Sequence, residues 1–272
     1  MNDATPQADH WHSGPTFALI VGILLATQPD WAADQRSPAI KETIDAIARK
    51  CSGNGDCLRE RVVHELPAGA VLQRVDSPDT DTIRWVDTRR SVGLVTDLDD
   101  GTRLIVLDRF GRKVLRELAD ALPAQGAVIL DLRANAGGDF GRMLQVAGRF
   151  TGAVVVAVTL TGEDTRRLSI PAANGNTWRG SLTVLVGPQT ASSAEVLAAL
   201  LRQHAGARVL GERTRGKDYL LRIVPIDQNW RVTLPGEVIG VPGESLVRGL
   251  RPDGPIPSDL YLQITAALRP QP

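Results

Sequence analysis

Aromatic residues are scarce in this chain, at 4% of its 272 residues. Proteins that bind single-stranded nucleic acid stack bases on aromatic side chains, and binding to any nucleic acid relies on clustered positive charge. The chain has no excess of positive charge, because its 31 basic residues are balanced by 31 acidic ones. We therefore expect no nucleic-acid partner and no bulk attraction to an anionic membrane.

Lysine is scarcer still. The basic residues are nearly all arginines, and the exceptions are Lys41, Lys50, Lys113 and Lys217. Arginine stays protonated in proteins, whereas a desolvated lysine can become a neutral amine and act as a base. Each lysine is therefore a candidate functional group, although a solvated surface lysine is the commoner case.

The N-terminal apolar run, residues 17–26, is too short to span a bilayer, for which a helix needs about 20 residues. Its length suits the core of a signal peptide, and the small residues Ala32 and Ala33 follow at a cleavage distance. The preceding stretch lacks Lys and Arg, so a buried or interfacial helix and a retained anchor stay open. We expect residues 1–33 to be a signal peptide or anchor, and the protein to be exported to the periplasm or beyond. Membrane association is expected only through this segment.

Cysteine occurs twice, at Cys51 and Cys57, on either side of a turn-rich stretch, Ser-Gly-Asn-Gly-Asp. In an exported protein this spacing favours a disulfide, and in a reducing compartment two free thiols. Two cysteines alone are too few ligands for a zinc site. We expect neither a metal nor a cofactor.

The rest of the chain alternates between helical and strand patterns. Apolar residues at helical spacing predict a small helical segment over residues 34–68, and short strands follow it, including one at 82–88. From residue 110 onward, strands and helices take turns, which predicts an α/β core over residues 69–272 with helices flanking the sheet. The polar, turn-rich residues 167–180 predict a surface loop.

Three segments in this core carry chemistry. DLRANAGG, residues 131–138, follows a buried strand, and its two glycines allow backbone amides to approach a ligand, although a tight turn explains them equally. TASSAE, residues 190–195, precedes a helix, so Ser192 is either an N-cap with Glu195 in a capping box or a nucleophile at a helix N-terminus. GERTRGK, residues 211–217, ends on Lys217.

Taken together and in this order, the three segments resemble the motifs of the C-terminal processing (tail-specific) protease family, and GLRPD at residues 249–253 resembles a fourth. The resemblance covers residues 90–260. It implies a crotonase/ClpP-like α/β core with a mixed β-sheet and a serine peptidase that acts on protein or peptide substrates. It also implies Ser192 as nucleophile, Lys217 as general base, and an oxyanion hole at Gly137, Gly138 and Ser193.

The sequence departs from the family pattern in two respects. Leu221 stands where many members carry a glutamine that orients the lysine, and Gln203 where others carry an aspartate, so the orienting role is unassigned. Residues 34–90 leave no room for a PDZ domain, which predicts a PDZ-less member. A catalytically silent peptide- or lipid-binding protein is the main alternative. Acyl-CoA chemistry and a triad that uses His204 are further ones.

Overall fold

The computed structural model describes residues 38–66, 70–74, 90–162, 165–173 and 175–268. The expected signal peptide or anchor, residues 1–33, and the strand expected at 82–88 lie outside these residues. The boundaries expected between the segments stay a prediction.

The core is built on a five-stranded mixed sheet with the strand order β2-β3-β4-β7-β8. Its strands are β2 (Val92–Asp97), β3 (Arg103–Leu107), β4 (Ala127–Asp131), β7 (Ser181–Val186) and β8 (Arg208–Gly211). β2 pairs antiparallel with β3, and the other pairs are parallel. The prediction of an α/β core with a mixed sheet is confirmed.

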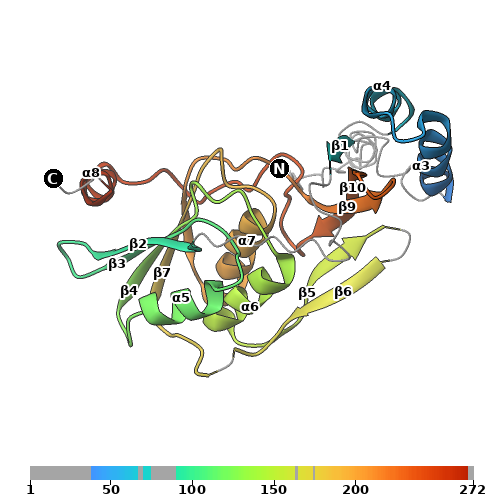
Figure 1. Cartoon of the computed structure of the whole chain (residues 1–272). Coiled ribbons are helices and arrows are strands. Elements are labelled where there is room, and N and C mark those ends of the chain that lie inside the picture. The colour runs from blue at the N-terminus through green and yellow to red at the C-terminus, as the bar shows by residue number, and fades with distance from the viewer. Residues whose placement is uncertain (1–37, 67–69, 75–89, 163–164, 174, 269–272) are drawn as a thin grey trace, which may run out of the picture.

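Helices cover both faces of this sheet (Figure 1). They are α5 (Val114–Ala121), α6 (Phe140–Thr151), α7 (Ser193–Ala205) and α8 (Ser258–Ala267). Because side chains alternate along a strand, Leu130 packs with α5, α6 and α7, while its neighbour Ile129 packs with Ile264 of α8. α7 is buried from Ser193 to Leu201, and it ends at Gly206, which adopts the left-handed conformation.

A second sheet extends away from the core. It has the order β1-β10-β5-β6, with β9 also paired to β10. Its strands are β1 (Val71–Arg74), β5 (Val154–Thr161), β6 (Thr165–Ile170), β9 (Tyr219–Pro225) and β10 (Trp230–Gly240). The loop expected at 167–180 is wrong in its first part, because residues 167–170 belong to β6. Thr165–Ile170 is polar because most of its side chains are exposed, and its pairing with β5 sets the conformation.

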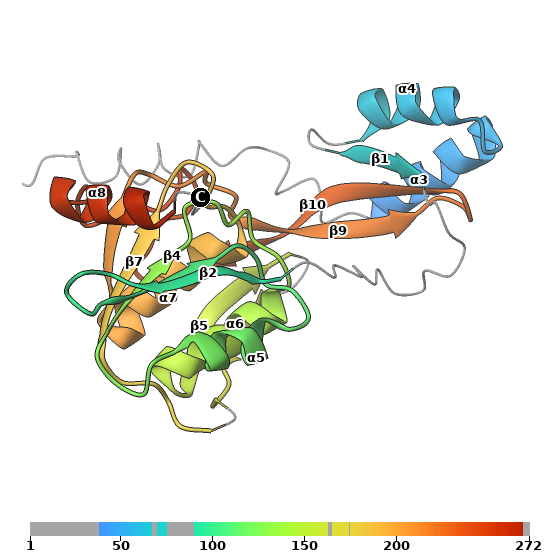
Figure 2. The ribbon, with the colours of Figure 1, turned by 60° about the vertical axis from the view of Figure 1, so that its left-hand side comes forward.

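The long hairpin of β9 and β10 carries a helical piece at its far end (Figure 2). This piece consists of α3 (Pro38–Cys51) and α4 (Gly55–Glu65), so the predicted helical N-terminal segment is confirmed. Its apolar side chains, including Ile47 and Leu58, pack against Val232 and Leu234 of the hairpin. A disulfide joins Cys51 to Cys57 across the turn between the two helices. Among the described residues, no helix has the length and apolar character needed to cross a membrane.

Candidate active site

The three chemically interesting segments meet at one edge of the core sheet. Each follows a parallel strand: residues 132–138 follow β4, residues 187–192 follow β7, and residues 212–217 follow β8. Because β4, β7 and β8 are neighbours, their carboxyl ends lie side by side. Two main-chain hydrogen bonds join the segments, from the amide of Ala191 to the carbonyl of Asn135 (3.1 Å) and from Arg215 to Thr190 (3.0 Å).

Ser192 sits in a strained backbone conformation where α7 begins. Its φ is 57° and its ψ is −127°, in a region that non-glycine residues rarely adopt. The side chain is half-buried. A serine in a sharp strand-to-helix turn is presented to the surface of the site, and the helix N-terminus stabilises negative charge that develops beside it.

Glu195 is the hub of the site. Its side chain is fully buried, and its carboxylate accepts hydrogen bonds from two of the three segments. One oxygen, Oε2, accepts from the amides of Ser192 (2.7 Å) and Lys217 (2.9 Å). The other, Oε1, accepts from the hydroxyl of Thr214 (2.6 Å) and the amide of Gly216 (2.7 Å). These bonds satisfy the buried carboxylate and fix the two residues of the expected dyad relative to each other.

Lys217 is half-buried in the loop after β8. Burial lowers the pKa of its amine, the positive charge of Arg215 lowers it further, and the negative charge of Glu195 opposes both effects. Its Nζ also lies 5.6 Å from the centroid of the Tyr219 ring. Beside it, burial raises the pKa of the Asp218 carboxyl. The surroundings of Lys217 therefore favour a neutral amine more than water does.

The paired glycines lie directly against Ser192. A Cβ on Gly137 would come within 3.0 Å of the Ser192 Cβ, and its φ of 105° also disfavours any side chain. The amide of Gly137 donates to Oδ1 of Asn135 (2.8 Å), so it is already engaged. No hydrogen bond within the described part of the chain uses the amides of Gly138 or Ser193. These two amides are the ones that can serve an oxyanion.

Two buried polar side chains brace the first two segments. Asn135 donates from Nδ2 to the carbonyl of Leu107 (2.9 Å), and Thr190 donates from Oγ1 to the carbonyl of Leu132 (2.8 Å). Before them, the Asp131 carboxylate and the Arg133 guanidinium form an ion pair at 2.6 Å. These contacts hold the glycine turn and the serine turn in place.

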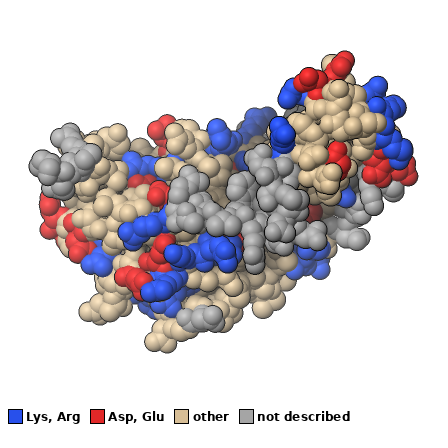
Figure 3. Space-filling view, in the orientation of Figure 1, with Lys and Arg blue, Asp and Glu red and all other residues tan. Residues whose placement is uncertain are grey.

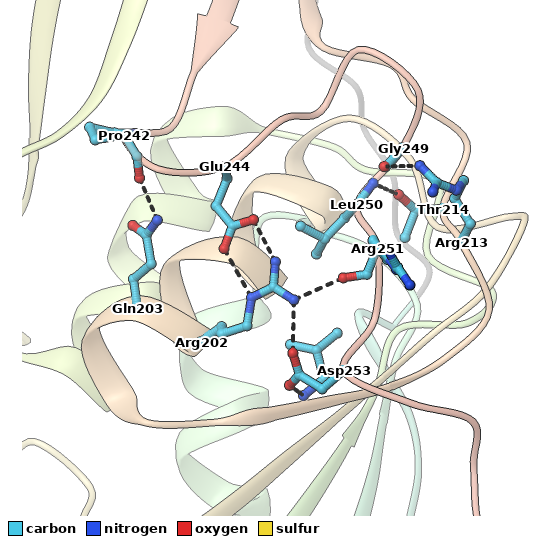
Figure 4. A network of polar contacts seen from close by, with 11 residues as sticks. Arg202, Gln203, Arg213, Thr214, Pro242, Glu244, Gly249, Leu250, Arg251 and Asp253 are labelled. Atoms are coloured by element: carbon cyan, nitrogen blue, oxygen red, sulfur yellow. Dashed lines mark hydrogen bonds and ion pairs between the residues drawn. The ribbon is translucent and has the colours of Figure 1, made fainter. Parts of the chain in front are cut away.

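The loop between β10 and α8, residues 241–257, contains the GLRPD motif and contacts the lysine segment. We call it the tail loop. The amide of Leu250 donates to Oγ1 of Thr214 (2.6 Å; Figure 4). The same hydroxyl donates to Glu195, so Thr214 connects the tail loop to Glu195. Arg202 of α7 anchors the loop through Glu244 (2.5 Å) and Asp253 (3.0 Å). Gln203, which stands where other members of the family carry an aspartate, donates from its side chain to the carbonyl of Pro242.

The structure also separates some residues from the site. His204 lies eleven residues beyond the start of α7, about 16 Å along the helix at 1.5 Å per residue, and its side chain is exposed. It is too far away to serve Ser192 as a base. The side chain of Leu221 is 49% exposed and has no polar atom with which to orient Lys217 by a hydrogen bond. Within the described ranges, no group of three or more His, Cys, Asp or Glu residues could hold a metal ion.

Sequence reasoning missed the residues that connect the segments. Glu195 was interpreted only as part of a capping box, and no role was proposed for Asn135, Thr190 or Thr214. Each is a polar residue inside one of the three motifs, and this position is the signal that could have revealed it.

An α/β core whose site lies on loops after adjacent parallel strands defines a broad class of enzymes and binding proteins. Within that class the match is specific: residues 103–255 match the sequence profile described as peptidase family S41. The chain belongs to this family.

Two named relatives are carboxyl-terminal-processing proteases. The one from Picosynechococcus sp. is 28% identical over 200 residues, covering 68% of this chain and 48% of that protein. The one from Synechocystis sp. is 34% identical over 118 residues, covering 42% of this chain and 27% of that protein. This chain thus spans at most about half the length of these relatives. A solved structure of a lipoprotein from Streptococcus agalactiae shares the fold, with a TM-score of 0.60 at 12% identity over 96% of this chain and 99% of that one.

Proposed function

We propose that this chain is a serine endopeptidase that hydrolyses peptide bonds in exported proteins, with Ser192 as nucleophile and Lys217 as general base. The observation that supports this most directly is the position of Glu195. One oxygen of its carboxylate, Oε2, accepts hydrogen bonds from the backbone amides of both Ser192 and Lys217. The half-burial of Lys217 and the lowered pKa of its amine favour the neutral base that the reaction needs.

In the first half of the reaction, neutral Lys217 takes the proton from Ser192 as the hydroxyl oxygen attacks the peptide carbonyl carbon. The carbonyl oxygen becomes an anion and accepts the free amides of Gly138 and Ser193. Each such donor contributes a factor of about 10²–10³ in rate. When the C–N bond breaks, protonated Lys217 returns the proton to the leaving amine, and an acyl-enzyme remains.

Water completes the cycle. Lys217 takes a proton from the water as its oxygen attacks the ester carbonyl, and then returns that proton to Ser192 as the acid product leaves. Because the lysine alternates between base and acid, it must exchange protons near the working pH, which a fully exposed lysine does poorly.

The experiment compares the wild type with Ser192→Ala and Lys217→Ala on an unfolded protein substrate. Labelling by an activated fluorophosphonate is measured in parallel. We expect both variants to remain folded and to lose hydrolysis, and Ser192→Ala to lose labelling. His204→Ala is the control and should retain activity.

A wild type that cleaves nothing and resists the fluorophosphonate would contradict the proposal. That result would favour a catalytically silent binding protein on the same core.

Export is the second part of the proposal. The disulfide between Cys51 and Cys57 supports it, because such bonds persist in oxidising compartments. Fractionation of cells that express the full chain should place it outside the cytoplasm. Neither cysteine should react with an alkylating reagent, because both are in the disulfide. Recovery in the cytoplasm with free thiols would contradict export.

A further inference from the structure

We infer that a rim of four arginines beside Lys217 binds acidic side chains of the peptide substrate. This inference rests on the proposed function. The arginine rim consists of Arg213 and Arg215 in the loop after β8, and Arg248 and Arg251 in the tail loop. All four side chains are exposed. They lie within or next to the GERTRGK and GLRPD motifs. None of them takes part in the hydrogen bonds to Glu195 or Thr214.

The two loops that carry the rim lie in direct contact. Nη1 of Arg213 donates to the carbonyl of Gly249 at 3.4 Å. A Cβ on Gly216 would come within 3.3 Å of the Arg248 Cα, so the backbone of Arg248 passes over the residue that precedes Lys217. The rim therefore borders the proposed dyad itself.

The charge of the rim is not neutralised within the described part of the chain. None of its four guanidinium groups forms an ion pair there. Glu244 and Asp253, the carboxylates of the tail loop, are both engaged by Arg202 (Figure 4). Glu195 is buried and accepts its own set of bonds, and Asp218 is half-buried. Glu212 is left as an exposed acidic neighbour.

The tail loop connects β10 with α8 and crosses the upper edge of the core in Figure 1. Blue side chains lie along part of that edge in the same orientation in Figure 3, with red ones beside them toward its left end. A positive surface of this kind raises the local concentration of acidic ligands and speeds their arrival. Because the rim borders Lys217, a peptide is the anionic ligand that its position favours.

A binding experiment tests the inference without catalysis. Ser192→Ala protein is titrated into a fluorescein-labelled Glu-rich peptide and into the same peptide with every Glu replaced by Gln, and fluorescence anisotropy is followed. We expect the Glu peptide to bind about tenfold more tightly at low salt, since several exposed pairs each contribute modestly, and the difference to shrink at high salt.

Two double variants locate the effect. Arg248→Glu with Arg251→Glu should abolish or reverse the preference. Arg179→Glu with Arg208→Glu is the matched control, because both residues are exposed and lie at the amino ends of β7 and β8, at the opposite edge of the sheet. This control should retain the preference.

A cleavage experiment then separates this inference from the proposed function. Cleavage sites of the wild type in an unfolded protein are mapped by mass spectrometry and should be enriched in Asp and Glu near the scissile bond. Cleavage without that enrichment overturns the acidic preference and leaves the peptidase standing. Equal binding of the Glu and Gln peptides also overturns the acidic preference. Binding of the protein to anionic vesicles, when it does not discriminate between the two peptides, does so as well. Absence of all cleavage by the wild type counts against the proposed function instead.

Discussion

Glu195 accepts the amide of Lys217 at 2.9 Å through the same oxygen that accepts the amide of Ser192. Lys217 lies 22 positions after Glu195 in the chain, so this bond depends on the pairing of β7 with β8. One buried carboxylate thus sets the distance between the proposed nucleophile and the loop of its base.

Glu195→Gln should impair both activity and stability. The substitution preserves size, but its NH₂ group must face one of the two pairs of donors, and each pair includes at least one backbone N–H, which is then left unpaired. We expect a loss of about 1–3 kcal/mol in the free energy of unfolding and a fall in kcat of about 10²-fold. Denaturant unfolding and steady-state kinetics measure the two effects.

Glu117→Gln is the control for this prediction. The carboxylate of Glu117 also accepts two amides, those of Ser91 (2.7 Å) and Val92 (3.1 Å), and it does so on α5, outside the three segments of the site. This variant should lose stability and retain kcat. Equal loss of kcat in both variants would contradict the special role of Glu195.

Gly137→Ala should abolish most activity. The new methyl group would crowd the Ser192 Cβ at 3.0 Å, and the φ of 105° would strain the backbone at a cost of about 1–3 kcal/mol. Gly126→Ala separates the two causes, because Gly126 has a φ of 116° but nothing within 4 Å of an added Cβ. We expect both variants to melt at lower temperature and only Gly137→Ala to lose activity. Retained activity in Gly137→Ala would count against the proposed position of the oxyanion.

Arg215→Gln should move the pH dependence of kcat toward alkaline pH. The positive charge of Arg215 lowers the pKa of Lys217, so its removal raises that pKa. Because the neutral amine is the active form, kcat rises with pH through this pKa, and the rising limb shifts to higher pH. The variant should be slower at neutral pH and equal to the wild type above the limb.

The charge-preserving control is Arg215→Lys, which should retain the wild-type profile. If the pH dependence of kcat is unchanged in Arg215→Gln, or shifts to lower pH, a group other than Lys217 governs the rise of kcat with pH.

The Cys51→Ser and Cys57→Ser double variant should lose stability in the helical piece. Closing so short a loop contributes about 2 kcal/mol by restricting the unfolded chain. Thermal unfolding followed by circular dichroism should show the loss, and reduced wild type should behave like the variant. A wild type that is indifferent to reductant would contradict the contribution of the disulfide.

The sequence by itself determined the local features of this protein. Apolar runs such as residues 127–130 predict buried strands, and Gly206 marks the end of α7, because hydrophobic pattern and glycine conformation act within a few residues. The order of the motifs was sufficient to indicate the family and to single out Ser192 and Lys217 as the residues to test.

Only the tertiary structure decided how these features work together. The polar residues 165–170 became a strand because β5 pairs with them, and the β9 and β10 hairpin carries α3 and α4 through contacts between distant segments. Glu195 makes the expected capping-box bond to the amide of Ser192, and it is also the hub of the site because its other donors come from the loop after β8. A buried carboxylate accepts hydrogen bonds from whichever donors the fold places around it. The local sequence pattern does not indicate which distant residues these will be.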